Sequence, residues 1–290
     1  MHPAPSLILF TVLSGLGFGL LVWLGFGLRA PVGLAAFVLF ALGYGLAGAG
    51  LVAAAFHLGH PERALKAFTQ WRSSWLSREA VLAAATLIIM APHAAGSVFR
   101  ATPLPVFGVL GAVLALATIM ATAMIYTQIR AVPRWHHWST PPVFMLAALA
   151  GGALLAAQTT LAAWLMAGLG VAMVLHWRQG DQRFAAAGSD AGTATGLGGL
   201  GRVRLLEPPH SGRNYLLREM VHVVGRKHAH KLRLIALGLG AVLPAALLLL
   251  PAGYAVIALA LLAHIAGMLA QRWLFFAEAE HVVGLYYGKG

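Results

Sequence analysis

The stretch SLILFTVLSGLGFGLLVWLGFGL, residues 6–28, contains no charged residue and is long enough to cross a lipid bilayer as a single helix. At about 1.5 Å per residue, roughly 20 residues span a hydrocarbon core of about 30 Å. Similar runs recur along the 290-residue chain, which is 60% hydrophobic and only 10% charged. In an average soluble domain about a quarter of the residues are charged. The sequence therefore predicts an all-α integral membrane protein.

Apolar windows and the polar breaks between them predict a bundle of eight transmembrane helices, with residues 1–290 forming one membrane domain. Residues 178–232 are expected to form a cytoplasmic linker that ends in a basic amphipathic helix at the membrane surface. An even number of spans places both termini on one side. The predicted spans are 6–28, 33–57, 80–99, 104–128, 141–157, 160–176, 233–251 and 254–275.

The positions of the 20 Lys and Arg residues orient this bundle. In the eight-span topology, all of them except Arg29 and Arg100 fall on the side of the termini. Because basic loops mark the cytoplasmic face, both termini are predicted to be cytoplasmic, in a bacterial cytoplasmic (inner) membrane. The same placement accounts for the net charge of +12 without a nucleic-acid partner. Membrane lipid is therefore expected as a partner, and nucleic acid is not.

Two features of composition bear on packing and on redox chemistry. The chain has no cysteine, which excludes Cys-ligated iron–sulfur clusters and disulfides from it. Small residues at close spacing allow helix backbones to approach one another, so glycines in the first two spans are expected to be packing sites. These glycines are Gly15, Gly17, Gly19, Gly25 and Gly27, then Gly43, Gly45, Gly48 and Gly50.

A polar stretch, HLGHPERALKAFTQWRSSWLSRE at 57–79, interrupts the apolar pattern between the second and third spans. His57 ends one span and Glu79 begins the next, so the two can approach each other in adjacent antiparallel helices. Reduction of a quinone requires two electrons and two protons, and a His or Glu within hydrogen-bond reach can deliver protons. An interfacial loop with snorkelling Arg and anchoring Trp explains the same composition equally well. The candidate quinone-binding residues are His57, Arg63, Trp71, Arg72, Arg78 and Glu79.

Three further groups of polar residues are candidates for other roles. The stretch RAVPRWHHWSTPP at 130–142 lies on the same side, where it could line the same site or form an aromatic belt. Partner docking is expected at Arg272, near the end of the last span, and at Arg218 and Arg226 in the basic helix. Two intramembrane histidines, His93 and His264, could ligate a b-type haem, but their predicted depths match poorly. No other metal site is predicted.

Four stretches resemble the DMSO reductase membrane anchor (DmsC) family. HLGHPERA at 57–64, Arg72 and LSREA at 76–80 resemble the family loop HLG-x-P-x-R-A that is followed by Leu-Ser-x-Glu. VPRWHHWSTP at 132–141 is similar to a later V-P-x-W motif. The endings RNYLLREM…RKHAHKLR and QRWLFFAEAEHVVGLYYG look most like the branch that anchors cytoplasmic sulfite dehydrogenases.

This resemblance implies an eight-helix anchor that carries neither an iron–sulfur cluster nor molybdenum. Such an anchor binds a ferredoxin-like iron–sulfur subunit, which relays electrons between a molybdopterin catalytic subunit and ubiquinone or menaquinone. The His and Glu of the family's quinone site correspond to His57 and Glu79. Because the loop that bears them is predicted to be cytoplasmic, sulfite oxidation with electron flow into quinone is favoured. The alternatives are an anchor of a DMSO or polysulfide reductase that oxidises quinol, and a b-haem-bearing anchor.

Overall fold

The computed structural model describes residues 2–56, 60–207, 212, 214, 216, 220, 228–251 and 253–287, and this part of the chain contains helices and no strands. The bundle helices are α1 (Pro5–Gly25), α2 (Gly33–Ala55), α3 (Trp75–Phe99), α4 (Pro105–Thr127), α5 (Thr140–Leu155), α6 (Thr159–Ala186), α9 (Ala229–Leu237), α10 (Leu243–Leu247) and α11 (Tyr254–Ala277). A π-helix, η4 (Gly238–Val242), joins α9 to α10. The connections contain η1 (Pro61–Phe68), α7 (Ala191–Thr195), η2 (Gly198–Leu200) and η5 (Val282–Tyr287).

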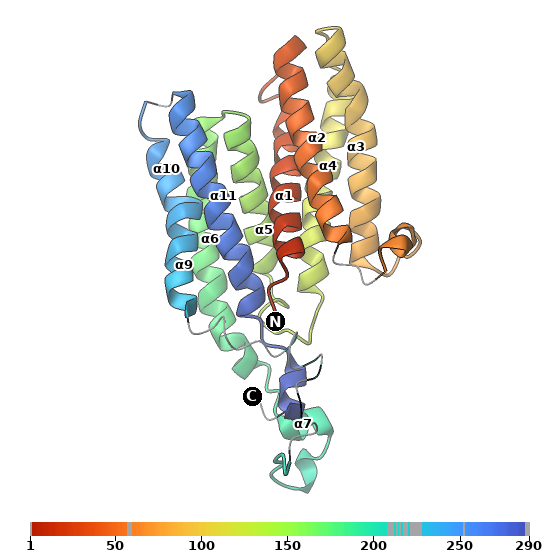
Figure 1. The fold of residues 1–290 in the computed structure, drawn as a ribbon, viewed down its shortest axis with the longest axis vertical. Helices are drawn as coiled ribbons and strands as arrows, with labels where there is room; N and C mark the ends of the chain where they lie inside the picture. Colours follow the sequence, from red (N-terminus) through yellow and green to blue (C-terminus); the bar gives the residue numbers. More distant parts are fainter. Residues whose placement is uncertain are drawn as a thin grey trace.

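These helices confirm the all-α membrane class. Seven helical segments of the described chain are long and apolar enough to cross a bilayer, with α9, η4 and α10 counted as one. The fifth predicted span, 141–157, corresponds to α5, which is not among these seven segments because it has only 16 residues and is about 24 Å long. The start of α1 and η5 lie at the same end of the bundle, the lower end in Figure 1. The eight-span count and the cytoplasmic location of this end remain predictions.

Helix α1 is the central helix of the bundle, with 72% of its apolar window buried. It packs against α2, α4 and α5. Close approach depends on glycine: a Cβ added to Gly17 would overlap the Ala47 backbone of α2, and one added to Gly19 would overlap the Ala148 carbonyl of α5. The packing prediction is therefore confirmed for these glycines. It is wrong for Gly27, Gly45 and Gly48, where no atom lies within 4 Å of an added Cβ.

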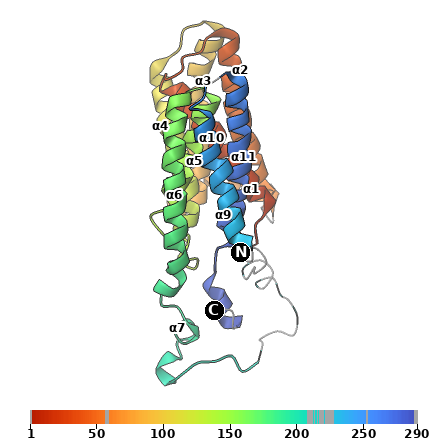
Figure 2. The same cartoon turned by 90° about the vertical axis from the view of Figure 1, so that its left-hand side faces the viewer.

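Helix α6 continues ten residues past the predicted end of the sixth span and projects from the lower end of the bundle (Figure 2). Its last turns contain polar residues that end an apolar window but do not end a helix. Asp181 in this extension accepts hydrogen bonds from Arg134 and Arg233, which fixes the extension to its neighbours. The described linker therefore begins after Ala186, with α7 and η2. Most of the predicted amphipathic helix at 214–233 lies outside the described residues.

The π-helix follows from a proline in the seventh apolar segment. Pro244 has no N–H, so it cannot donate to the carbonyl of Gly240 four residues earlier. The chain widens locally into η4, where the Leu243 N–H bonds to the Gly238 carbonyl. Gly267 of α11 packs directly against Gly240, and no room is left for a side chain at Gly267. The Gly240 carbonyl therefore faces α11.

Candidate functional site

Glu79 lies in the second turn of α3, about 6 Å from the start of that helix at the lower end of the bundle. Ser74 caps α3 by accepting a hydrogen bond from the Ser77 N–H. The Glu79 side chain is only 4% exposed, and the Thr122 hydroxyl of α4 donates to its Oε1. Within the described residues Glu79 forms no ion pair. A buried carboxylate without a cationic partner is costly, and its presence in a membrane helix indicates a function.

Arg78, next to Glu79 in the sequence, binds the loop that precedes α3. Arg78 stacks on Trp75 at 4.4 Å and donates to the carbonyls of Trp71 and Arg72, at 3.0 and 2.7 Å. Arg78 therefore fastens the loop to the helix. Arg63, Trp71 and Arg72 are exposed, with the Arg72 guanidinium 5.7 Å from the Trp71 ring. His57 lies outside the described residues, and the quinone-binding role of all six residues remains a prediction.

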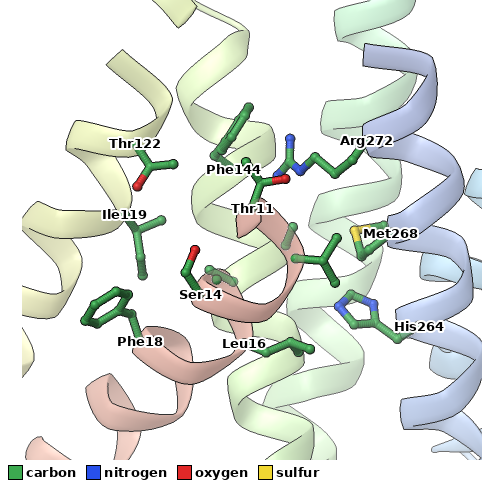
Figure 3. A pocket seen from close by; sticks show the side chains of 14 residues that line it. Thr11, Ser14, Leu16, Phe18, Ile119, Thr122, Phe144, His264, Met268 and Arg272 are labelled. Carbon is green, nitrogen blue, oxygen red and sulfur yellow. The ribbon is translucent and has the colours of Figure 1, made fainter. Parts of the chain in front are cut away.

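Behind Thr122 lies a central cavity between α1, α4, α5 and α11 (Figure 3). Its volume is about 20 Å³, which is room for about one water molecule and too little for a quinone ring. Its polar lining consists of Thr11 and Ser14 from α1, Thr122 from α4, and His264 and Arg272 from α11. Sequence reasoning missed this cavity, because hydroxyl residues in apolar helices give no signal of their own.

Arg272 lines the cavity and is only 2% exposed. Its guanidinium lies over the Phe144 ring at 3.5 Å, a close cation–π contact. Its Nη1 is buried and forms no hydrogen bond in the described part of the chain. The prediction of partner docking is untested, but the side chain is interior and presents no surface to a partner. The other two predicted docking residues, Arg218 and Arg226, lie outside the described residues.

The two candidate haem ligands lie in different surroundings. His264 is fully buried about 20 Å from the lower end of α11, and its Nδ1 lies 2.7 Å from the Gly240 carbonyl freed by Pro244. His93 lies 3.0 Å from the Leu104 carbonyl at the start of α4 and packs edge-on against Phe40. No cluster of three or more metal-ligating side chains occurs among the described residues. Haem ligation remains an untested alternative.

A second polar cluster joins four elements at the lower end. Arg233 of α9 donates to Asp181 of α6 and to Glu278, which follows α11. Arg134, in the connection between α4 and α5, pairs with the same two carboxylates. The polar stretch 130–142 was predicted to lie at this end, but no sequence pattern pairs its Arg134 with Asp181 or Glu278.

A chain of hydrogen bonds runs inward beside this cluster. The Ser139 hydroxyl lies 2.8 Å from His137 Nδ1 and 2.9 Å from Nδ1 of His176, which is buried in α6. Partial burial, with Arg183 and His136 nearby, lowers the pKa of His137 below its usual range. The Ser139 N–H also donates to His137 Nδ1, which makes that nitrogen the acceptor. These hydrogen bonds therefore fix the tautomers of His137 and His176, and they connect the α4–α5 segment to α6.

The fold and the buried carboxylate define a multi-pass helical membrane protein with a polar site at one end of its bundle. The family model for the DMSO reductase anchor subunit (DmsC) matches residues 1–175, and the chain belongs to this family. It is also 32% identical to a sulfite dehydrogenase subunit of Allochromatium vinosum over 328 aligned positions, which cover 99% of each chain. No solved structure matches the chain. The matched family region includes Glu79 and Thr122, while His264 and Arg272 lie in the part that only the relative covers.

Proposed function

We propose that this chain is the membrane anchor of a sulfite-oxidising complex and that it completes a quinone site at the lower end of its bundle. The family and the similarity to a sulfite dehydrogenase subunit support the role of anchor. The observation that carries the quinone site is Glu79, whose carboxyl group is buried near the end of a membrane helix with one hydroxyl as its partner. A proton donor is needed at such a position if a quinone is reduced beside it.

The two half-reactions of the proposal balance in electrons and protons. In the catalytic subunit, oxidation of sulfite with one water yields sulfate, two protons and two electrons. At the anchor, quinone takes up two electrons and two protons to become quinol. In the proposal Glu79 and His57 hydrogen-bond the head group and deliver protons, and Thr122 orients the Glu79 carboxyl group. The positive charges of Arg63, Arg72 and Arg78 stabilise negative charge on the reduced ring, with Trp71 packing beside it. Because the central cavity is too small, the ring binds outside it, on the side of the loop.

The partners in this proposal are those implied by the family resemblance. A ferredoxin-like iron–sulfur subunit docks at the lower end and passes electrons from a molybdopterin catalytic subunit to the quinone. This arrangement requires the lower end to face the cytoplasm across a bacterial inner membrane. The excess of Lys and Arg on that side supports this orientation.

Replacement of Glu79 by Gln tests the proposal in the intact complex, with Glu207→Gln in the exposed linker as a matched control. Two activities are measured: sulfite oxidation coupled to quinone, and sulfite oxidation coupled to ferricyanide, which accepts electrons before the quinone site. Because a positioned general acid contributes about 100-fold or more, E79Q is expected to lower the first rate by about that factor and leave the second unchanged. Unchanged quinone-linked turnover in E79Q would overturn the role of Glu79.

A further inference from the structure

An apolar groove runs along the outer face of the bundle, between α6 and the continuous helix made by α9, η4 and α10 (Figure 2). Its volume is about 500 Å³, and every residue that lines it is apolar, between Met166 and Leu175 on one side and between Leu237 and Ala245 on the other. Its length along α6 is about 14 Å, close to the roughly 15 Å of hydrocarbon in one leaflet of a bilayer. This first groove therefore has the length of one acyl chain.

A second groove adjoins the first at Val242, an exposed residue that lines both. It follows the α9–α10 helix from Leu234 to Ala246, has a volume of about 640 Å³, and is also lined by apolar residues alone. Two neighbouring grooves match the two acyl chains of a phospholipid. The single isoprenoid tail of a quinone would fill only one of them.

A cation lies below the lower end of each groove. Arg178 follows Leu175 by three residues, so it lies one turn below the first groove on the same face of α6. Lys231 precedes Leu234 by three residues and lies one turn below the second groove. Both side chains are exposed. Each groove therefore ends at a positive charge, as an acyl chain ends at its head group.

The two cations lie at a similar depth. A Cβ added to Gly170 would lie 3.5 Å from the side chains of Leu237 and Ala241, so Gly170 is level with the middle of this pair. The two helices run in opposite directions, and eight residues further towards the lower end lie Arg178 on one helix and Lys231 on the other. One head group at the membrane surface can therefore approach both.

The described part of the chain does not neutralise these cations. Neither Arg178 nor Lys231 forms an ion pair with a described residue. Asp181, the one carboxylate of α6, is held by Arg134 and Arg233 instead. Basic residues at the end of a groove between membrane helices attract anionic lipid head groups. The charge therefore favours an anionic lipid over a zwitterionic one.

We propose that the two grooves form a binding site for one anionic phospholipid of the lower leaflet, with an acyl chain in each groove and the head group at Arg178 and Lys231. The apolar grooves select a lipid with two chains, and the two cations select its negative charge. The bound lipid contacts both α6 and α9, the helices that Arg233 already joins through Asp181. This site is separate from the proposed quinone site and does not depend on Glu79.

Lipid analysis of the purified complex tests the selection by charge. Phospholipid per anchor chain is measured by mass spectrometry after extraction in mild detergent, for the parent and for the double variant Arg178→Gln/Lys231→Gln. Arg100→Gln, which changes an exposed Arg at the opposite end of the bundle, is the matched control. The double variant is expected to retain several-fold less phosphatidylglycerol and cardiolipin, with phosphatidylethanolamine unchanged, and the control to equal the parent. Unchanged anionic lipid in the double variant, or equal loss of both lipid classes, would overturn the proposal.

A second pair of variants tests the groove itself. Ala167→Phe fills the first groove and keeps both cations, while Ala35→Phe changes an exposed residue of α2 outside both grooves. Ala167→Phe is expected to lose the anionic phospholipid several-fold, and Ala35→Phe to retain it. Loss of quinone in place of phospholipid from Ala167→Phe would assign the groove to an isoprenoid tail and overturn the proposal, as would unchanged phospholipid.

Thermal unfolding of the delipidated complex provides a readout that does not depend on lipid retained from the cell. Dioleoyl-phosphatidylglycerol is expected to raise the Tm of the parent by several degrees, because a ligand that binds the folded state stabilises it. Dioleoyl-phosphatidylcholine should not, and the double variant should respond to neither lipid. Equal shifts with the two lipids, or the parent's shift in the double variant, would overturn the proposal.

Discussion

Arg233→Met tests whether the ion network at the lower end holds the bundle together. The guanidinium of Arg233 binds two carboxylates in different surroundings. Its Nε lies 2.7 Å from Glu278, whose side chain is 4% exposed. Its Nη2 lies 2.6 Å from Asp181, whose side chain is 46% exposed. The Arg233–Glu278 pair should therefore contribute more to the free energy of unfolding than the Arg233–Asp181 pair.

The expected magnitudes follow from this difference in exposure. Loss of one partner from a buried pair costs about 3–5 kcal/mol, and a solvent-exposed pair contributes about 0–1 kcal/mol. After Arg233→Met, Glu278 keeps Arg134 at 3.6 Å, which places the cost near the lower limit. We expect Arg233→Met to reduce the free energy of unfolding by about 3 kcal/mol. Asp181→Asn should reduce it by about 1 kcal/mol or less.

The assay is equilibrium unfolding of the purified protein in mixed detergent micelles, followed by circular dichroism for both variants and the parent. Met keeps most of the aliphatic length of Arg233, so the comparison isolates the charge. Raising the salt concentration should weaken the Asp181 half more than the Glu278 half, because exposed pairs are screened. A larger loss of stability in Asp181→Asn than in Arg233→Met would refute the assignment of the buried half as the stronger one.

Three further predictions concern packing, the loop and topology. Gly19→Ala should destabilise the protein by about 2 kcal/mol, because the new methyl group would overlap the Ala148 carbonyl of α5. Gly45→Ala, where the methyl group has open space, should stabilise it by about 0.5–1 kcal/mol. Thermal unfolding measures both changes. Arg78 holds the carbonyls of Trp71 and Arg72 with two different nitrogens, whereas Lys has one, so Arg78→Lys should loosen the loop and speed its cleavage by trypsin. In this cysteine-free chain, Ser73→Cys should react with an impermeant maleimide only from the cytoplasm, and Thr102→Cys only from outside; the reverse pattern contradicts the predicted orientation.

The helices could be read from the sequence because hydropathy alone determines which residues must lie in lipid. Each predicted span corresponds to a helical segment, and the close approach at Gly17 and Gly19 follows from the missing side chains. The end of α6 could not be placed, since a helix may continue into water while the apolar signal stops. Asp181 holds that extension through partners about 50 residues away in the chain, and sequence distance conceals such pairs.

The candidate site was only partly predictable for a similar reason. Glu79 stood out because carboxylates are rare in membrane helices. Its partner Thr122 did not, because a hydroxyl in an apolar helix usually bonds its own backbone. The interior position of Arg272 was missed because Arg near a helix end is normally an interfacial residue. The Arg272 guanidinium packs against the Phe144 ring of α5, a contact that no sequence pattern reveals.

Electron cryo-microscopy of the intact complex with bound quinone can locate the quinone relative to Glu79. A quinone carbonyl oxygen is expected within hydrogen-bond distance of the Glu79 carboxyl group, on the loop side of Thr122 and outside the central cavity. A quinone ring bound elsewhere in the complex, with Glu79 still buried against Thr122, would contradict it.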